Sequence, residues 1–222
     1  ENLRWVQSSL GLLQAFSQHG GRRVVMAGTC AEYDWQHGPC SESVTPLSPT
    51  TLYGTCKHSL QLMLTAFSKE TRLSAAWGRI FFLFGPHEAP DRLVAHVIQS
   101  LLQKKPARCS RGDQARDFLY VQDVADAFVS LLESAVSGPV NIASGRPTAL
   151  RDVIGKIGEL LHRPDLIQLG ALPTREEDPP LLVADVGRLT KEVGWTPQCD
   201  LTSGLERTIE WWKGRMAAGK HE

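Results

Sequence analysis

The sequence lacks the features that mark membrane-spanning or nucleic-acid-binding proteins. No apolar run approaches the ~20 residues that cross a bilayer, and no signal peptide opens the chain. Lysine plus arginine equals aspartate plus glutamate, at 24 each, so no global basic field favours nucleic acid. These absences favour a cytoplasmic protein that uses neither a membrane nor nucleic acid as its partner.

Cysteine is present, but it is not arranged as a structural framework. The cysteines are odd in number and scattered: Cys30, Cys40, Cys56, Cys109 and Cys199. This distribution fits a reducing compartment better than a set of disulfides. No Cys-x-x-Cys cluster suggests zinc, so we expect no metal site.

What the sequence does contain is an alternation of strand-like and helix-like segments. The 222 residues are 42% hydrophobic, enough for one large domain or two small ones. Apolar residues recur at helical spacing over 2–18, 51–69, 91–103, 123–134, 148–162 and 204–214. Strand-like runs lie between them at 21–28, 75–85, 116–121 and 138–144. The alternation predicts a mainly parallel sheet flanked by helices.

The stretch LYGTCK sets Tyr53 and Lys57 four positions apart. On a helix these side chains face the same way, one turn apart. The pKa of a phenol is ~10, and a cation within roughly 4–6 Å favours the charged form of the phenol. Such a pair can exchange a proton with a substrate hydroxyl or carbonyl. The same spacing also occurs on solvated helix faces, so the pair alone does not decide between packing and chemistry.

Neighbouring segments favour chemistry. The chain contains, in this order, VVMAGTCAEYD, PLSPTTLYGTCKHS, GRIFFLFGPHE, RDFLYVQDVADAF, VNIASGRPTAL and GWTPQCDLTSGLERTIEWW. These segments resemble the extended short-chain dehydrogenase/reductase family, specifically its NAD-dependent sugar-nucleotide epimerase/dehydratase branch, over nearly the whole chain. The resemblance implies an α/β fold: the C-terminal part of a Rossmann-like doubly wound parallel sheet, plus a small α/β substrate-binding region.

The resemblance also implies catalytic roles. Thr29 lies four residues before Tyr33, where the family keeps a catalytic Ser or Thr that hydrogen-bonds the reacting sugar oxygen. Tyr53 would be the acid/base, and Lys57 would lower the pKa of that phenol and bind the nicotinamide ribose. The cofactor, NAD or NADP, would perform the redox step, with Phe81 as a further cofactor contact.

Substrate-side roles follow from the same resemblance. Arg116 matches an arginine that meets the nucleotide diphosphate, and Arg175 and Asp178 match a later Arg-x-x-Asp that grips phosphate and ribose. The alternative for these residues is surface salt bridges. Phe82 and Arg92 stand at substrate-binding positions where the family often has asparagine.

Two further positions bear on the type of reaction. His87 resembles a histidine that acts as an acid in related epimerase-reductases, although it also fits an ordinary loop residue. Dehydratases of the branch carry an Asp-Glu pair directly after the catalytic threonine, whereas this chain has Cys30 and Ala31. We therefore expect an epimerase or a reductase.

The family's opening Gly-x-x-Gly-x-x-Gly turn, which holds the cofactor pyrophosphate, has no match here. By this comparison roughly the first hundred residues of a dinucleotide-binding unit are missing. We expect an incomplete Rossmann-like portion at 1–85, mixed Rossmann and substrate-binding elements at 86–216, and a tail at 217–222.

Two functions stay open. The chain is either part of an NAD(P)-dependent sugar-nucleotide epimerase or reductase, or an inactive remnant that binds a sugar nucleotide or a protein partner. A homodimer is also expected. The resemblance implies pairing through the helix of the Tyr-x-x-x-Lys segment and the helix before it, and the alternative is self-association across an exposed edge of the 22–28 strand.

Overall fold

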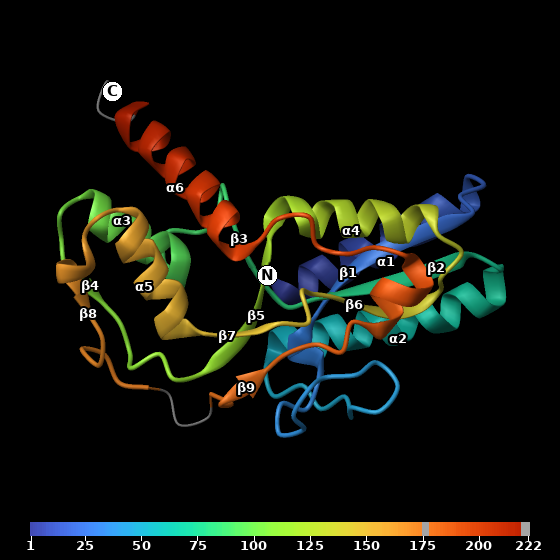
Figure 1. Cartoon of the computed structure of the whole chain (residues 1–222). Coiled ribbons are helices and arrows are strands. Elements are labelled where there is room, and N and C mark those ends of the chain that lie inside the picture. The colour runs from blue at the N-terminus through green and yellow to red at the C-terminus, as the bar shows by residue number, and fades with distance from the viewer. Residues whose placement is uncertain (175–177, 219–222) are drawn as a thin grey trace. The chain divides into compact units, whose positions relative to one another are not determined.

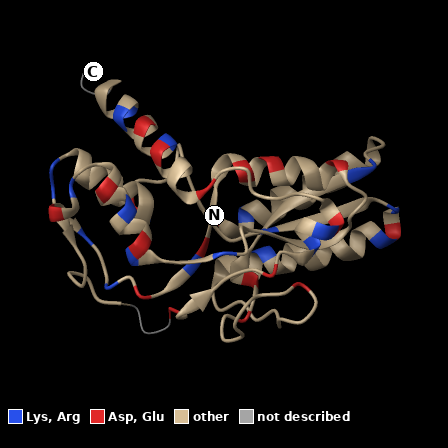
Figure 2. Ribbon diagram, viewed as in Figure 1, with Lys and Arg blue, Asp and Glu red and all other residues tan. Residues whose placement is uncertain are grey.

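The computed structural model describes residues 1–174 and 178–218, and the chain forms two compact units (Figure 1). Unit 1 comprises Glu1–Phe81, Ala125–Gly145 and Ala184–Thr196. Unit 2 comprises Phe82–Val124, Arg146–Val183 and Pro197–Glu222. Within the described ranges, every helix is too short or too polar to cross a membrane. Both signs of charge are interspersed along the ribbon (Figure 2).

Unit 1 is built on a three-stranded parallel sheet. Its strands are β1 (Arg23–Thr29), β2 (Ser74–Ile80) and β6 (Gly138–Ile142), in the order β1-β2-β6. Its helical elements are α1 (Asn2–Gln18), η1 (Cys30–Glu32), α2 (Leu52–Thr71) and η3 (Leu189–Val193), and α4 (Val121–Glu133) enters it from unit 2. The predicted parallel sheet with flanking helices is confirmed.

Alternation along β2 explains how helices cover both faces of this sheet. Successive residues of a strand point to opposite faces. Trp77 is 1% exposed and packs with Leu13 of α1 and Leu60 of α2. The next residue, Gly78, faces α4, because a side chain there would lie 2.6 Å from the Phe128 ring. The α1–α2 pair therefore covers one face and α4 the other.

Unit 2 is built on strand β5 and three helices. Strand β5 (Ala115–Tyr120) pairs in parallel with β3 (Phe82–Phe84) and β9 (Leu181–Leu182), and antiparallel with β7 (Pro147–Ala149). Strands β4 (Ala107–Arg108) and β8 (Ile167–Gln168) form a separate pair. The helical elements are α3 (Leu93–Leu102), α5 (Leu150–Leu160), η2 (Pro164–Leu166) and α6 (Leu201–Ala218). The core is aliphatic and aromatic: Phe84, Val97, Ile98, Ile154, Ile157 and Leu205 are each at most 1% exposed.

The prediction of one strand over 75–85 is wrong. Strand β2 ends at Ile80 and β3 begins at Phe82, and the two belong to different sheets. Between them, the backbone N–H of Phe81 donates to the carbonyl of Ile142 at 3.3 Å. A continuous apolar run carries no periodicity that would reveal such a break.

Candidate active site

The candidate site begins where strand β1 ends. Thr29 is the last residue of β1 and the N-cap of the short helix η1, and it is 8% exposed. Its hydroxyl accepts the N–H of Ala31 at 3.3 Å, and the Glu32 carboxylate accepts the N–H of Thr29 at 2.8 Å. These reciprocal bonds form a capping box, which fixes the turn that carries the hydroxyl.

Helix α2 begins against this turn. Thr51 caps the helix by accepting the N–H of Gly54 at 3.1 Å. A side chain at Gly54 would lie 2.4 Å from the carbonyl oxygen of Ala31. Glycine therefore allows the first turn of α2, which carries Tyr53, to lie directly on η1.

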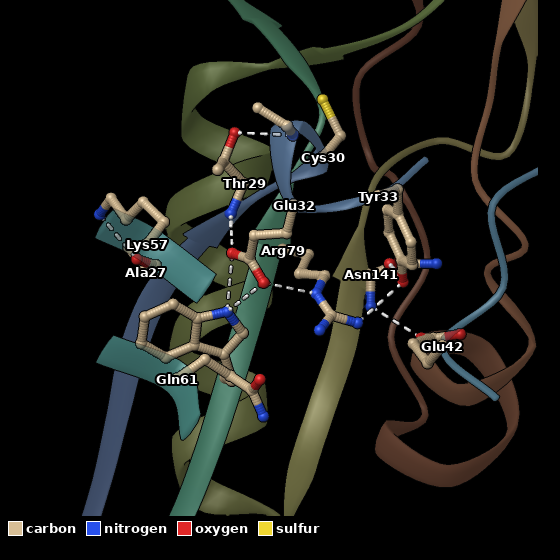
Figure 3. A network of polar contacts seen from close by, with 12 residues as sticks. Ala27, Thr29, Cys30, Glu32, Tyr33, Glu42, Lys57, Gln61, Arg79 and Asn141 are labelled. Atoms are coloured by element: carbon tan, nitrogen blue, oxygen red, sulfur yellow. Dashed lines mark hydrogen bonds and ion pairs between the residues drawn. The ribbon is translucent and has the colours of Figure 1, made fainter. Parts of the chain in front are cut away.

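Tyr53 and Lys57 line one cavity of about 340 Å³. The remaining lining comes from α1 and from the same face of α2: Asn2, Trp5, Val6, Ser9, Cys56 and Leu60. Tyr53 is 43% exposed, so its phenol is accessible to a ligand. The Lys57 ammonium donates to the carbonyl oxygen of Ala27 at 2.8 Å, two residues before Thr29 (Figure 3). Thr29, Tyr53 and Lys57 thus come from two adjoining elements, the end of β1 and the start of α2.

The ammonium of Lys57 lies in a partly buried environment. Burial lowers its pKa below the usual value for lysine, and the nearby Glu32 carboxylate acts in the opposite direction. In the part of the chain that the structure describes, no hydrogen bond joins the Tyr53 phenol to Lys57 or Thr29. Catalytic hydrogen bonds often form only when substrate is bound. The lack of a direct bond between Tyr53 and these residues therefore does not argue against proton exchange at the cavity.

In unit 2 the structure brings Phe82, Arg116 and Asp178 together. Arg116 is 2% exposed, and its guanidinium lies 2.5 Å from the Asp178 carboxylate and 5.5 Å from the centre of the Phe82 ring. It also donates to the carbonyls of Ala115 and Pro179 at 2.8 Å. The pairing of Arg116 with Asp178 is an internal one, and the contacts of these residues with a diphosphate and a ribose stay predictions.

The other predicted residues occupy varied settings. Phe81 is buried with its ring 6.3 Å from that of Tyr33. His87 is exposed at φ 66°, with its ring 4.7 Å from that of Trp211. Arg92 is exposed at the N-cap of α3, without a side-chain capping bond. Arg175 lies outside the described residues.

Several residues near the site were not predicted from the sequence. Asn2 and Trp5 line the cavity from α1, and no local pattern links them to Tyr53. Glu32 could have been identified, because Thr29-Cys-Ala-Glu32 has the spacing of a capping box. Among the described residues, no group of three or more His, Cys, Asp or Glu side chains could hold a metal ion.

The fold and the Tyr-x-x-x-Lys helix are those of the short-chain dehydrogenase/reductase class. Within this class, the chain belongs to the NAD dependent epimerase/dehydratase family, whose model matches residues 4–143. The UDP-glucuronate 4-epimerase of Thermodesulfobacterium geofontis is 27% identical over 213 residues, which cover 94% of this chain. The chain spans 64% of the length of that relative.

Solved structures agree in fold. The UDP-N-acetylglucosamine 4-epimerase of Methanobrevibacter ruminantium, in complex with UDP-N-acetylmuramic acid, superimposes with a TM-score of 0.90 at 26% identity. The superposition covers 97% of this chain and 72% of that one. MoeE5, in complex with UDP-glucuronic acid and NAD, gives a TM-score of 0.80 at 30% identity, over 92% of this chain and 69% of that one. The predicted Rossmann-like fold is confirmed.

Proposed function

We propose that the chain carries the proton-transfer site of an NAD(P)-dependent epimerase or reductase of nucleoside-diphosphate sugars. The observation that carries the proposal is the shared cavity of Tyr53 and Lys57, next to the strand end that bears Thr29. Relatives that are UDP-sugar epimerases support the substrate class. In this proposal residues 1–85 form the catalytic portion, and Arg116 and Asp178 remain the predicted diphosphate and ribose contacts.

The cavity residues fit one end of a nicotinamide dinucleotide. An ammonium and a phenol on one cavity wall can hydrogen-bond ribose hydroxyls, and the structure of MoeE5 with NAD supports this choice of cofactor. Lys57 would hold the ribose, and Tyr53 would contact it. When bound, the nicotinamide supplies hydride transfer.

The chain's own residues would handle the proton and the sugar. Tyr53 would exchange a proton with the sugar hydroxyl or carbonyl, and Thr29 would orient the same oxygen through its hydroxyl. The Lys57 ammonium, fixed on Ala27, would keep positive charge beside the phenol. Cys30 and Ala31 leave the two positions directly after Thr29 without a carboxylate, which supports epimerisation or reduction over elimination of water.

Calorimetric titration of this chain should show weak or absent binding of NAD and NADP. The sequence has no Gly-x-x-Gly-x-x-Gly turn to hold the pyrophosphate, so the cavity can recognise only the nicotinamide end. A panel of UDP-, GDP- and dTDP-sugars in the same experiment would identify the nucleotide. Micromolar affinity for NAD in the wild type would contradict this prediction, and the same affinity in Lys57→Met would contradict the assignment of Lys57 to the cofactor.

We further propose that the chain forms a homodimer through the outer surface of α1 and α2. These helices expose large apolar side chains: Leu3, Trp5, Leu12 and Leu62 are 54% to 72% exposed. Leu60, by contrast, is 4% exposed and belongs to the core. Trp5 and Leu12 lie seven positions apart on one face of α1, and exposed apolar patches are typical of interaction sites.

Sedimentation velocity should therefore detect a dimer that Leu12→Glu or Leu62→Glu dissociates, because either change places a charge in an apolar contact. Leu172→Glu, at a residue of unit 2 that is 44% exposed, is the matched control and should leave the dimer intact. A wild-type protein that sediments as a monomer at high concentration would disprove this proposal.

A further inference from the structure

A buried polar network lies beneath the end of strand β1 (Figure 3). Its centre is the ion pair of Glu32 and Arg79, whose side chains are 0% and 1% exposed and lie 2.8 Å apart. Burying a charged pair costs free energy unless further hydrogen bonds satisfy both groups. A fully buried carboxylate next to the candidate site therefore requires an explanation beyond packing.

Both oxygens of the Glu32 carboxylate are in use. Oε1 accepts the N–H of Thr29 at 2.8 Å and the indole N–H of Trp77 at 2.9 Å. Oε2 accepts the Arg79 guanidinium at 2.8 Å and the same indole at 3.1 Å. The carboxylate thus joins Thr29, the last residue of β1, to Trp77 and Arg79, which point to the same side of β2.

The carboxylate also lies against the residue before Thr29. A side chain at Gly28 would lie 2.7 Å from Glu32 Oε1 and 2.1 Å from the Trp77 indole nitrogen. Ala27, on the other side of Gly28, is the residue whose carbonyl accepts the Lys57 ammonium. Glu32 therefore supports the last three residues of β1. This stretch includes Thr29, and its Ala27 carbonyl binds the Lys57 ammonium of α2.

The network continues from Arg79 to Asn141 of strand β6. Arg79 donates to the Tyr33 hydroxyl at 3.1 Å, and this hydroxyl donates to Asn141 of β6 at 2.8 Å. The Asn141 amide donates in turn to the carbonyls of Cys40 and Asp185 at 2.9 and 3.0 Å. With every link satisfied, the Glu32 carboxylate has little freedom to move.

We propose that Glu32 is a positioning residue that fixes the end of β1 and, through it, the Thr29 hydroxyl and the Lys57 ammonium. The catalytic part of this inference rests on the proposed function. Its electrostatic part does not, because the Glu32 carboxylate lies against Gly28, next to the Ala27 carbonyl that accepts the Lys57 ammonium, and it opposes the effect of burial on the pKa of Lys57. Glu32 thus acts on both groups, on one through the backbone and on the other through its charge.

Two variants separate these actions. Glu32→Gln keeps an oxygen for the Thr29 N–H but removes the charge, whereas Glu32→Asp keeps the charge but shortens the side chain. The pKa of Lys57 can be followed by the NMR shift of its ε-carbon, with the signal assigned by Lys57→Met. Glu42→Gln is the matched control, because Glu42 accepts the N–H of Asn141 in the same network.

The Lys57 pKa should fall in Glu32→Gln, fall less in Glu32→Asp, and stay at the wild-type value in Glu42→Gln. If Glu32→Gln does not fold, Glu32→Gln/Arg79→Met removes the unpaired guanidinium and should show the same direction. A Lys57 pKa that is equal in the wild type and in a folded charge-removing variant would overturn the electrostatic part.

Activity at saturating NAD and sugar nucleotide tests the positional part. The alkaline limit of the rate should move to lower pH in Glu32→Gln, following the fall in the Lys57 pKa. In Glu32→Asp the alkaline limit should move less, while kcat falls and KM changes little, because Thr29 is displaced. Full kcat in Glu32→Asp would refute positioning of Thr29. If instead Tyr53→Phe retained wild-type turnover, the proposed function would fail, and the Lys57 titration would still test Glu32.

Discussion

If the chain turns over a sugar nucleotide at saturating NAD, replacing Tyr53 by phenylalanine should lower that turnover by roughly 10²–10⁴-fold, the range typical of a lost general acid/base. The change removes one oxygen from a side chain that is 43% exposed and lines the cavity. In the described part of the chain, that oxygen makes no hydrogen bond to the protein. The free energy of unfolding, measured by urea denaturation, should therefore stay within about 0.5 kcal/mol of the wild type.

Tyr33→Phe is the matched control, because it removes the same oxygen from a buried position. The Tyr33 hydroxyl accepts from Arg79 and donates to Asn141, so its loss removes one hydrogen bond from each of these two buried polar side chains. We expect this variant to lose about 1–3 kcal/mol of stability. Wild-type turnover in Tyr53→Phe, under conditions where substrate binds, would remove the phenol from the mechanism.

The elements that could be predicted from the sequence are those set by local periodicity. The helical pattern over 2–18 matches the bounds of α1, and the Tyr53–Lys57 spacing places both side chains on one cavity, as helix geometry requires. Strands β4, β8 and β9 contain only two residues each, too few to show any alternation. They exist because partners distant in sequence pair with them, which a local pattern cannot reveal.

The residues of the candidate site also divide into those that local segments indicate and those that depend on partners distant in sequence. Thr29 and Tyr53 were found because each lies within a segment that resembles a known family. The pairing of Arg116 with Asp178 joins residues 62 positions apart, and the partnership of Glu32 with Arg79 joins residues 47 apart. Both pairs depend on which strands become neighbours. The sequence therefore indicated the residue types of the site, but not which of them neutralise each other.

The largest loss of stability is expected for Arg79→Met. This change leaves the Glu32 carboxylate buried without its counter-ion, and breaking a buried ion pair costs about 3–5 kcal/mol. Urea denaturation should show a lower midpoint with an unchanged slope. Lys213→Met is the control, because its ion pair with Glu210 is exposed, and its midpoint should barely change.

Adding Glu32→Gln to Arg79→Met should restore part of the lost stability. The glutamine removes the unpaired charge and still offers an oxygen to the Thr29 N–H and the Trp77 indole. We expect a coupling energy of about 0.5–3 kcal/mol between the two positions. Replacement of both partners is not expected to reach wild-type stability, because the carboxylate serves four hydrogen bonds and the amide oxygen cannot replace them all. Additive losses in the double variant would mean that Glu32 and Arg79 stabilise the protein independently, contrary to a single network that organises the end of β1.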